Sequence, residues 1–488
     1  MRLPFRAASI CLLVFLFAMN VYRAVTQAIT HDEALTYSWF VSQPWDVVFH
    51  RYDANHHVLF TILSKLIVSV AGVNEFTMRI PTIAACALYF WVVFRLCEII
   101  FGSGWLLLLS VSALSMNPLM LDFLSAARGY GMALALFLLG VYLLFGFLRS
   151  PETTRSKRRL IATGLTFAAS VCSNITYLVP ITAATLMFLS MHWLRRHTTP
   201  DLRDRMLPVE NTARFLVTPF LVVSWLILVF PLSAASPDHF YYGAHSWREA
   251  AESLVIFSFY GLPAYWLIPN SAMAREVTYA GMAVSLAFAI VLAGFAVARW
   301  KRISDAERAM IFIAGIAGMS LGAITAGFYL AGVVLPLDRT AIYWVLLLTF
   351  AMLLAIRFAP GPRWIGCVLA VPMLVVIAQY ALCFRTTFYQ AWLFHRHCDQ
   401  IVAYMERDPA RPAGRPVVVG GSWEMAAPIN FYRASRKLAW LAEMERTDQL
   451  QVADYWTFDM YQADQVAKRG LRIVWRDSLS GTVLAVPK

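Results

Sequence analysis

Apolar residues in this chain are gathered into runs of about 20 residues, separated by shorter polar segments that hold most of the charges. A helix of about 20 residues spans a hydrocarbon layer of about 30 Å. The pattern therefore predicts an α-helical polytopic membrane protein with about eleven transmembrane helices. The predicted helices lie at residues 7–27, 80–100, 104–122, 129–149, 160–175, 177–194, 214–234, 278–299, 309–334, 340–358 and 364–383.

Two further apolar stretches are too short or too charged to count as crossings. Residues 58–72 carry Lys65 near their middle, which favours a helix that lies in the membrane interface. Residues 247–266 are rich in aromatic side chains and place Arg248 and Glu249 on one side, so we expect a second helix of this kind.

The C-terminal part of the chain has a different pattern of apolar and polar residues. In chain order, it predicts a strand, a helix and two strands, at residues 415–421, 422–433, 472–475 and 482–486. About 100 residues are enough for a small domain. We therefore expect a transmembrane domain over residues 1–383, followed by a small extracytoplasmic α/β domain over residues 384–488.

Basic loop segments indicate the orientation in the membrane. Four of them fall on the side that the N-terminus shares, at residues 149–159, 195–214, 299–308 and 357–363. Because Lys and Arg are enriched in cytoplasmic loops, we expect a cytoplasmic N-terminus and an uncleaved signal anchor. The outer side then holds a catalytic loop at residues 28–79, a second loop at 235–277 and the C-terminal domain.

The overall composition agrees with this class of protein. Hydrophobic residues make up 59% of the chain and charged residues 14%, whereas soluble domains are usually about 45–50% apolar. The net charge of +12 would suit a nucleic acid partner, but Lys and Arg cluster in short loops between apolar runs. We therefore expect membrane lipids, and no nucleic acid, among the partners.

An acidic pair stands directly after the first apolar run, where Asp32 and Glu33 follow His31. Carboxylates near hydrocarbon are costly and persist where they face a polar cavity, pair with cations or carry out chemistry. Asp32 and Glu33 are therefore the candidate catalytic residues, one as a base and the other as its partner. A helix N-cap formed by Thr30 or Asp32 is the structural alternative.

Histidines and other polar residues form a second cluster in the same loop. Asp53, Asn55, His56 and His57, together with His31, are candidates for contacting the substrate or for binding a divalent metal ion. Their spacing matches no specific metal motif, and such residues are also common on polar surfaces. A metal is therefore an open alternative, and no cofactor is predicted with certainty.

Cations on the outer side are candidates for binding a phosphate group. Arg128 and Arg339 each lie in a tight turn with polar neighbours, where a guanidinium can bind a phosphate through two hydrogen bonds. Lys65 and Arg79 are further candidates in the first loop and at its end. Arg79 could instead extend along the membrane face as an ordinary interfacial arginine.

The order of these features resembles the GT-C superfamily of integral membrane glycosyltransferases, especially the branch of protein O-mannosyltransferases and lipid A aminoarabinose transferases. The resemblance runs from about residue 7 to residue 383. It rests on segments 32–33, 53–60, 74–81, 127–130 and 335–341. The chain lacks a separate DxD motif in the first loop and the Trp-Trp-Asp motif of oligosaccharyltransferases, so the oligosaccharyltransferase branch is not expected.

The resemblance implies transfer of a sugar from a polyprenyl-phosphate donor to a glycan, lipid or protein acceptor, at the outer face of a bacterial inner membrane. Asp32 would deprotonate or orient the acceptor hydroxyl. Arg128, Arg339 and Lys65 would stabilise the charge on the leaving phosphate.

Aromatic residues of the C-terminal domain could stack on a sugar, although they are equally typical of a protein core. The candidates for this contact with the acceptor or sugar are Trp423, Tyr455 and Trp456. A secondary transporter or flippase for a lipid-linked or anionic solute is the alternative function, but transporters usually hold their ionisable residues near the middle of the bilayer.

Overall fold

The computed structural model describes residues 3–149, 153–199, 206–260, 270–298, 303–359 and 362–488. Nine helices within those residues are long and apolar enough to cross a membrane, so the chain is a multi-pass membrane protein, as predicted. They are α1 (Leu3–Thr26), α5 (Glu75–Phe101), α8 (Gly129–Arg149), α10 (Leu178–Thr198), α12 (Val209–Ser233), α14 (Ala272–Ala298), α15 (Asp305–Ala331), α16 (Ile342–Arg357) and α17 (Arg363–Leu382).

The predicted crossing at residues 104–122 is divided into two shorter helices, α6 (Trp105–Ser115) and α7 (Pro118–Phe123). The break follows from the pair Asn117 and Pro118. Proline has no backbone N–H to continue the first helix, and the Asn117 side chain accepts a hydrogen bond from the backbone of the second.

The predicted crossing at residues 160–175 lies in α9 (Thr153–Ser173), whose first turns are basic and which is not among the nine helices. Helix α9 packs between α8 and α12.

The two predicted interfacial segments are also helical. Helix α4 (Val58–Ala71) has 14 residues, and α13 (Trp247–Phe259) covers the first part of the second segment. The remainder of that segment, residues 261–266, lies outside the described residues.

The first loop begins with α2 (His31–Thr36), which continues into a π-helical turn, Tyr37–Val41, and then α3 (Trp45–His50). Thr30 caps α2 because its hydroxyl accepts a hydrogen bond from the Glu33 N–H. The Glu33 carboxylate accepts one in return from the Thr30 N–H. This capping box fixes the direction in which Asp32 leaves the helix.

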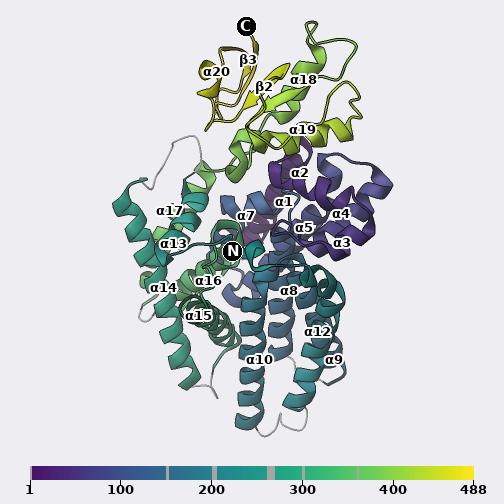
Figure 1. Ribbon diagram of the computed structural model, residues 1–488. Helices are drawn as coiled ribbons and strands as arrows, with labels where there is room; N and C mark the ends of the chain where they lie inside the picture. The colour runs from purple at the N-terminus through teal and green to yellow at the C-terminus, as the bar shows by residue number, and fades with distance from the viewer. Residues whose placement is uncertain (1–2, 150–152, 200–205, 261–269, 299–302, 360–361) are drawn as a thin grey trace.

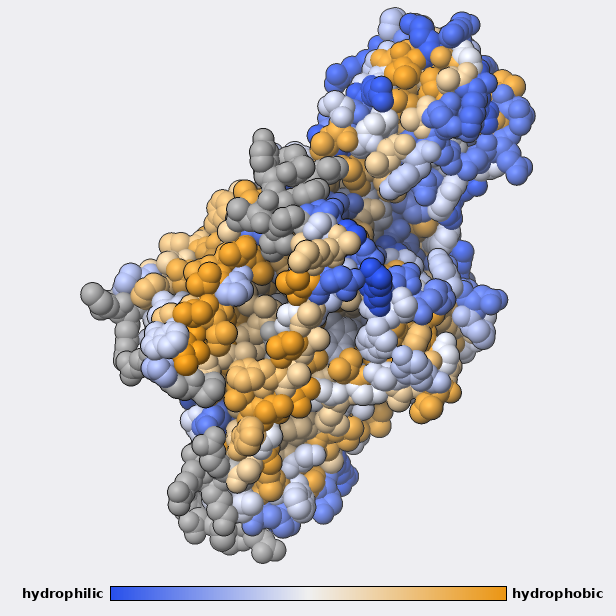
Figure 2. Space-filling view, turned by 90° about the vertical axis from the view of Figure 1, so that its left-hand side faces the viewer, coloured by the Kyte–Doolittle hydropathy of each residue, from blue (hydrophilic) through white to orange (hydrophobic). Residues whose placement is uncertain are grey.

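The helices form two groups beneath the C-terminal region (Figure 1). One group contains α8, α9, α10 and α12, and the other contains α14 to α17, with α10 and α15 in contact between them. Apolar side chains cover the middle of the face seen in Figure 2, whereas the C-terminal region is mostly polar around a smaller apolar patch. This apolar belt is what a membrane requires of its protein surface.

The ends of the helices farthest from the C-terminal region carry basic residues. Arg149, at the end of α8, pairs with Asp305 at the start of α15, with Nε and Oδ2 3.1 Å apart. Arg195, in the last turn of α10, donates a hydrogen bond to the Leu148 carbonyl. Several of the basic segments that the sequence assigns to one side of the membrane therefore meet at one end of the bundle.

Residues 384–488 form a small mixed structure with four strands in the order β1-β2-β4-β3. Strand β2 runs parallel to β1 and antiparallel to β4, which is antiparallel to β3. The strands are β1 (Val419–Gly421), β2 (Tyr455–Phe458), β3 (Leu471–Arg476) and β4 (Val483–Pro487). The helices are α18 (Cys398–Arg407), α19 (Trp423–Ser435) and α20 (Gln465–Lys468).

The predicted strands and helix of this region are present, and β2 is an additional central strand. Helix α19 packs on α2, so the C-terminal region lies directly over the first loop. Apolar side chains of α18 and α19 are continuous with the core of the helical bundle, whereas Trp456, Phe458 and Val483 belong to a separate cluster within the sheet. Short 3₁₀ turns complete the structure at Ile175–Tyr177, Pro237–Phe240, Asp338–Ala341 and Gln390–His395.

Candidate active site

A cavity of about 620 Å³ lies where the first loop, the second loop and the C-terminal region meet. Its polar wall contains the side chains of Asp32, Arg128 and Arg339. Another part of its wall is apolar and comes from helices of membrane length, α12 and α15. The apolar lining residues of these helices are Leu228, Leu232, Ala323 and Ile324.

Asp32 is held between two guanidinium groups. Its Oδ2 lies 2.9 Å from Arg339 Nη1 and 3.8 Å from Arg128 Nη2. The carboxylate side chain remains 13% exposed, so the cavity can reach it. Burial by itself would raise the pKa of Asp32, but Arg339 and Arg128 outweigh it and hold that pKa below the ordinary value. The carboxylate is therefore charged at neutral pH.

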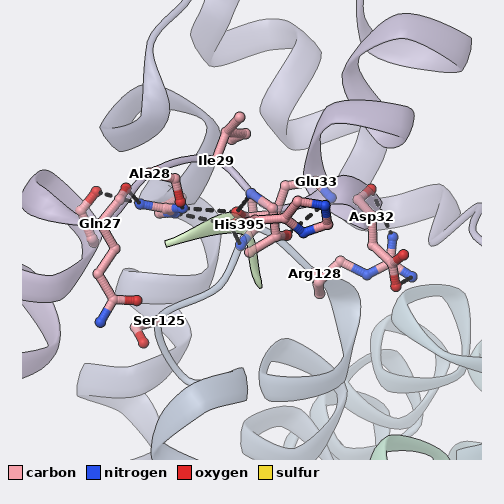
Figure 3. A network of polar contacts seen from close by, with 12 residues as sticks. Gln27, Ala28, Ile29, Asp32, Glu33, Ser125, Arg128 and His395 are labelled. Atoms are coloured by element: carbon pink, nitrogen blue, oxygen red, sulfur yellow. Dashed lines mark hydrogen bonds and ion pairs between the residues drawn. The ribbon is translucent and has the colours of Figure 1, made fainter. Parts of the chain in front are cut away.

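Arg128 is fixed by hydrogen bonds to the first loop (Figure 3). Its Nη1 donates to the Asp32 carbonyl at 3.2 Å and to the Thr36 hydroxyl at 2.9 Å. Asn55 also contributes, since its side-chain amide donates to the Asp32 carbonyl at 3.2 Å. Asp53 in turn accepts from the Asn55 N–H at 2.8 Å. Asp53 and Asn55 thus position Asp32 while also lining the cavity.

Arg339 is positioned by residues that the sequence did not single out. Its guanidinium lies over the ring of Tyr242, 4.3 Å from the ring centre. The Tyr242 hydroxyl donates to Asp338 at 2.5 Å, and the Ser253 hydroxyl accepts from the Asp338 N–H at 3.0 Å. Asp338 has a positive φ of 35°, which is uncommon for a residue with a side chain. These contacts join the second loop to the turn that carries Arg339.

Glu33 and Arg79 do not line the cavity, and their predicted catalytic and phosphate-binding roles stay predictions. Both side chains are fully buried and form a two-pronged ion pair at 2.8 and 2.7 Å. The Ala127 N–H donates to Glu33 at 2.5 Å, next to Arg128. Arg79 also donates to three carbonyls at the end of α1 and just after it. The pair therefore joins three segments and has no free polar atom for a substrate.

Lys65 does not line the cavity either, and its predicted role at the donor phosphate stays a prediction. Its Nζ donates to the carbonyls of Val41 and Gln43 and lies 5.2 Å from the centre of the Trp45 ring. Lys65 thus ties α4 to the end of the π-helical turn.

His31 lines the cavity next to Asp32, and its ring stacks on that of His395, with the ring centres 5.9 Å apart. His31 Nδ1 and His395 Nε2 lie 2.8 and 3.1 Å from the Glu424 carbonyl, so each of these nitrogens carries a proton. Burial lowers the pKa of His31 and lowers that of His395 to about 3. Both rings are therefore neutral at pH 7, and Nε2 of His31 keeps its lone pair. His395 and Glu424 were not identified from the sequence.

The other two candidate histidines, His56 and His57, pack against residues away from His31 and His395. His56 stacks on Phe40 with the ring centres 3.9 Å apart. His57 Nδ1 lies 3.0 Å from the Ser173 carbonyl, and burial lowers its pKa well below the ordinary value. Across the described residues, no group of three or more His, Cys, Asp or Glu side chains is arranged to hold a metal ion.

Of the three aromatic candidates in the C-terminal region, Trp423 alone lines the cavity. Tyr455 and Trp456 belong to β2, where they are 2% and 3% exposed. Both side chains are used in the packing of the sheet, and their predicted contact with a sugar stays a prediction.

No family model and no curated protein sequence matches the chain. Two solved structures are similar over most of it. The first is ArnT from Cupriavidus metallidurans bound to undecaprenyl phosphate, with 12% identity and a TM-score of 0.42, covering 98% of this chain and 97% of that chain. The second is the oligosaccharyltransferase AglB from Archaeoglobus fulgidus, in complex with an inhibitory peptide and a dolichol-phosphate. It shares 10% identity at a TM-score of 0.44, covering 94% of this chain and 70% of that chain. Both likenesses are distant.

Proposed function

We propose that this chain is a GT-C-type membrane glycosyltransferase that moves a sugar from a polyprenyl-phosphate donor to an acceptor at the outer face of the membrane. The observation that carries the proposal is the position of Asp32. Its carboxylate is held by Arg339 and Arg128 in a cavity that is also lined by apolar residues of α12 and α15. Guanidinium groups suit the phosphate of the donor, and the apolar wall suits its lipid chain.

The pairing of Asp32 with two arginines supports a mechanism in which binding of the donor activates the base. In the free protein, Arg339 and Arg128 lower the pKa of Asp32 and make it a weak base. A donor phosphate that binds the same guanidiniums neutralises part of their charge, so the pKa of Asp32 rises. The carboxylate can then accept the proton of the acceptor hydroxyl as that oxygen attacks the anomeric carbon.

The leaving group completes the reaction. As the new glycosidic bond forms, the bond between the anomeric carbon and the phosphate oxygen breaks, and the electron pair stays on the phosphate. Arg128 and Arg339 then stabilise the additional charge on the polyprenyl phosphate. Attack from the face opposite the phosphate inverts the anomeric carbon.

The orientation rests on charge distribution. Arg149 and Arg195 lie at the end of the bundle that is remote from the cavity. Because basic residues favour the cytoplasmic side, the cavity and the C-terminal region are assigned to the outside, and a bacterial inner membrane fits this arrangement.

The proposal is tested by measuring both undecaprenyl phosphate binding and sugar transfer. The variants Arg339→Ala and Asp32→Asn should differ in their effect on binding. Arg339→Ala should weaken binding of this carrier by about tenfold or more, because a phosphate contact is lost. Asp32→Asn should abolish transfer but bind the carrier as tightly as the wild type or more tightly, because the competing carboxylate is gone. Weaker carrier binding in Asp32→Asn would contradict the assignment.

The same samples address the alternative function. Movement of a lipid-linked or anionic solute into vesicles without any glycosylated product would support a transporter or flippase and would overturn the transferase.

A further inference from the structure

A second cationic position lies in the cavity on the side of the C-terminal region. Arg446 lines the cavity together with Trp39 and Trp423. Its guanidinium carbon lies 5.4 Å from the centre of the Trp39 ring and 4.8 Å from the centre of the Trp423 ring. Trp39 comes from the π-helical turn of the first loop, and Trp423 is the first residue of α19.

The alternation of arginine and aromatic rings continues beyond the cavity. Arg51 lies 5.3 Å from the centre of the same Trp39 ring and 5.8 Å from that of Phe40. Arg51, Trp39, Arg446 and Trp423 therefore form one series, which we call the Arg–Trp series. Stacking on aromatic rings orients a guanidinium and leaves the N–H groups at its edge free to bind another group.

The two arginines of the Arg–Trp series are less neutralised by carboxylates than the two arginines that hold Asp32. Arg128 and Arg339 already share a carboxylate. In the described part of the chain, neither Arg446 nor Arg51 forms a salt bridge (the 15 pairs found there involve other residues). Glu424 is a carboxyl group that Arg446 influences, and burial and the nearby Asp459 raise its pKa to about 7. It therefore neutralises Arg446 only in part at neutral pH.

The Arg–Trp series extends to the residue that precedes the proposed base. The rings of Trp423 and His31 are nearly perpendicular, with their centres 5.3 Å apart, and His31 directly precedes Asp32. The apolar lipid wall belongs instead to α12 and α15. A molecule could thus place a hydroxyl at Asp32 and a second group at Arg446 at the same time.

We infer that the acceptor carries an anionic group, a phosphate or a carboxylate, close to the hydroxyl that receives the sugar, and that Arg446 binds it with Arg51 in support. The inference rests on the proposed glycosyltransferase function and narrows its acceptor to acidic glycans or glycolipids. A planar guanidinium forms paired hydrogen bonds with either anion. Trp423, which also lines the cavity, supplies apolar surface for the attached sugar.

The test uses matched disaccharides and the full-length protein in detergent. Binding of trehalose, trehalose 6-phosphate and a disaccharide ending in glucuronate is measured by calorimetry at two salt concentrations. We expect the wild type to bind at least one of the two anionic sugars about tenfold more tightly than trehalose, with the advantage reduced by salt. The stronger of the two identifies the anion as phosphate or carboxylate.

Three variants separate a specific site from general positive charge. Arg446→Ala should remove the advantage of the anionic sugar, and Arg446→Lys should keep only part of it, because the charge remains but the planar group is lost. The control is Arg411→Ala. Arg411 lies 4.5 Å from the centre of the Trp440 ring but does not line the cavity, so its replacement should leave binding unchanged.

The outcomes distinguish this inference from the proposed function. Equal binding of neutral and anionic sugars, or an unchanged preference in Arg446→Ala, would overturn the anionic acceptor. Undecaprenyl phosphate binding is measured on the same samples and should be the same in Arg446→Ala as in the wild type. Failure of the wild type to bind the carrier, with the sugar preference intact, would overturn the donor site and leave the acceptor subsite supported.

Discussion

Replacement of Glu33 by glutamine tests whether this residue is structural, as its contacts indicate, or catalytic, as its position in the sequence suggests. Glu33 accepts four hydrogen bonds, two on each carboxylate oxygen. Two come from Arg79 and the others from the N–H groups of Thr30 and Ala127. The side chains of Glu33 and Arg79 are both 0% exposed, so water cannot replace a lost partner.

The expected cost follows from this count. Glutamine presents an NH₂ group where Glu33 has its second oxygen, so two of the four donors lose their acceptor. Hydrogen bonds to a charged group contribute about 1.5–3 kcal/mol each, which gives about 3–6 kcal/mol. Breaking a buried ion pair costs about 3–5 kcal/mol by direct comparison, in the same range. Glu33→Gln should therefore lower the free energy of unfolding by several kcal/mol.

The measurement is chemical denaturation in detergent, with transfer activity recorded on the same protein below its unfolding transition. Glu98→Gln is the control, since Glu98 pairs with Arg95 and Arg6 near the surface and its side chain is 25% exposed. A partly exposed pair of this kind is worth about 1 kcal/mol or less. A Glu33→Gln protein that is as stable as Glu98→Gln but has lost transfer would refute the structural role and restore the catalytic one.

The pH dependence of the same variant provides a second check. Burial would raise the pKa of Glu33, but Arg79 and the backbone N–H donors outweigh it, so the pKa of the folded state lies below the ordinary value. The stability that Glu33 contributes is then complete above about pH 4.3 and is lost as the pH falls through the folded-state pKa. The difference between wild type and variant should be constant from pH 8 to pH 5 and should shrink at lower pH.

Three further predictions concern individual side chains. Lys65→Met should leave undecaprenyl phosphate affinity within about twofold of the wild type, because the ammonium group of Lys65 is bound to carbonyls outside the cavity. A tenfold loss of affinity would place Lys65 at the phosphate. Tyr242→Phe should weaken carrier binding by about three- to tenfold, because it removes a hydrogen bond that holds the Arg339 turn; unchanged affinity would mean that this bond does not position Arg339. Glu424→Gln should reduce the pH dependence of stability between about pH 4.3 and pH 7, because the pKa of this carboxyl group is raised to about 7 in the folded state and the stability falls as the pH rises from the unfolded-state pKa to that value. Thermal melts of wild type and variant from pH 5 to pH 8 measure this, and parallel curves below pH 7 would contradict it.

Much of the architecture could be predicted because membrane helices leave a strong signal in one sequence. Runs of about 20 apolar residues are rare outside membrane helices, and the strands at the C-terminus alternate or cluster apolar residues between turns. The break at Asn117 and Pro118 was not predicted, because hydropathy remains high across it. Only the missing N–H of proline and the capping amide of asparagine mark the point where the helix is interrupted.

The sequence indicated which residues could take part in the chemistry of the site, but not which of them pair with one another. Asp32 and Glu33 are adjacent carboxylates in similar surroundings, yet one faces a cavity and the other is buried against Arg79. Arg339, which pairs with Asp32, is 307 positions away in the chain, so no local spacing could connect them. The tertiary fold decides which of several cations and anions meet.

The C-terminal region contributes to the site in a way that residue types could not have revealed. The group that holds both His31 and His395 is the backbone carbonyl of Glu424, which any residue would supply. What the sequence must provide is the start of α19 at the correct place, so that this carbonyl faces the first loop while Trp423 faces the cavity. Since α19 is also packed on α2, a displacement of the C-terminal region would move the imidazole beside Asp32 and the Arg–Trp series together. The region is therefore a wall of the cavity, and under the proposed function acceptor choice and proton transfer are expected to change together when its docking is altered.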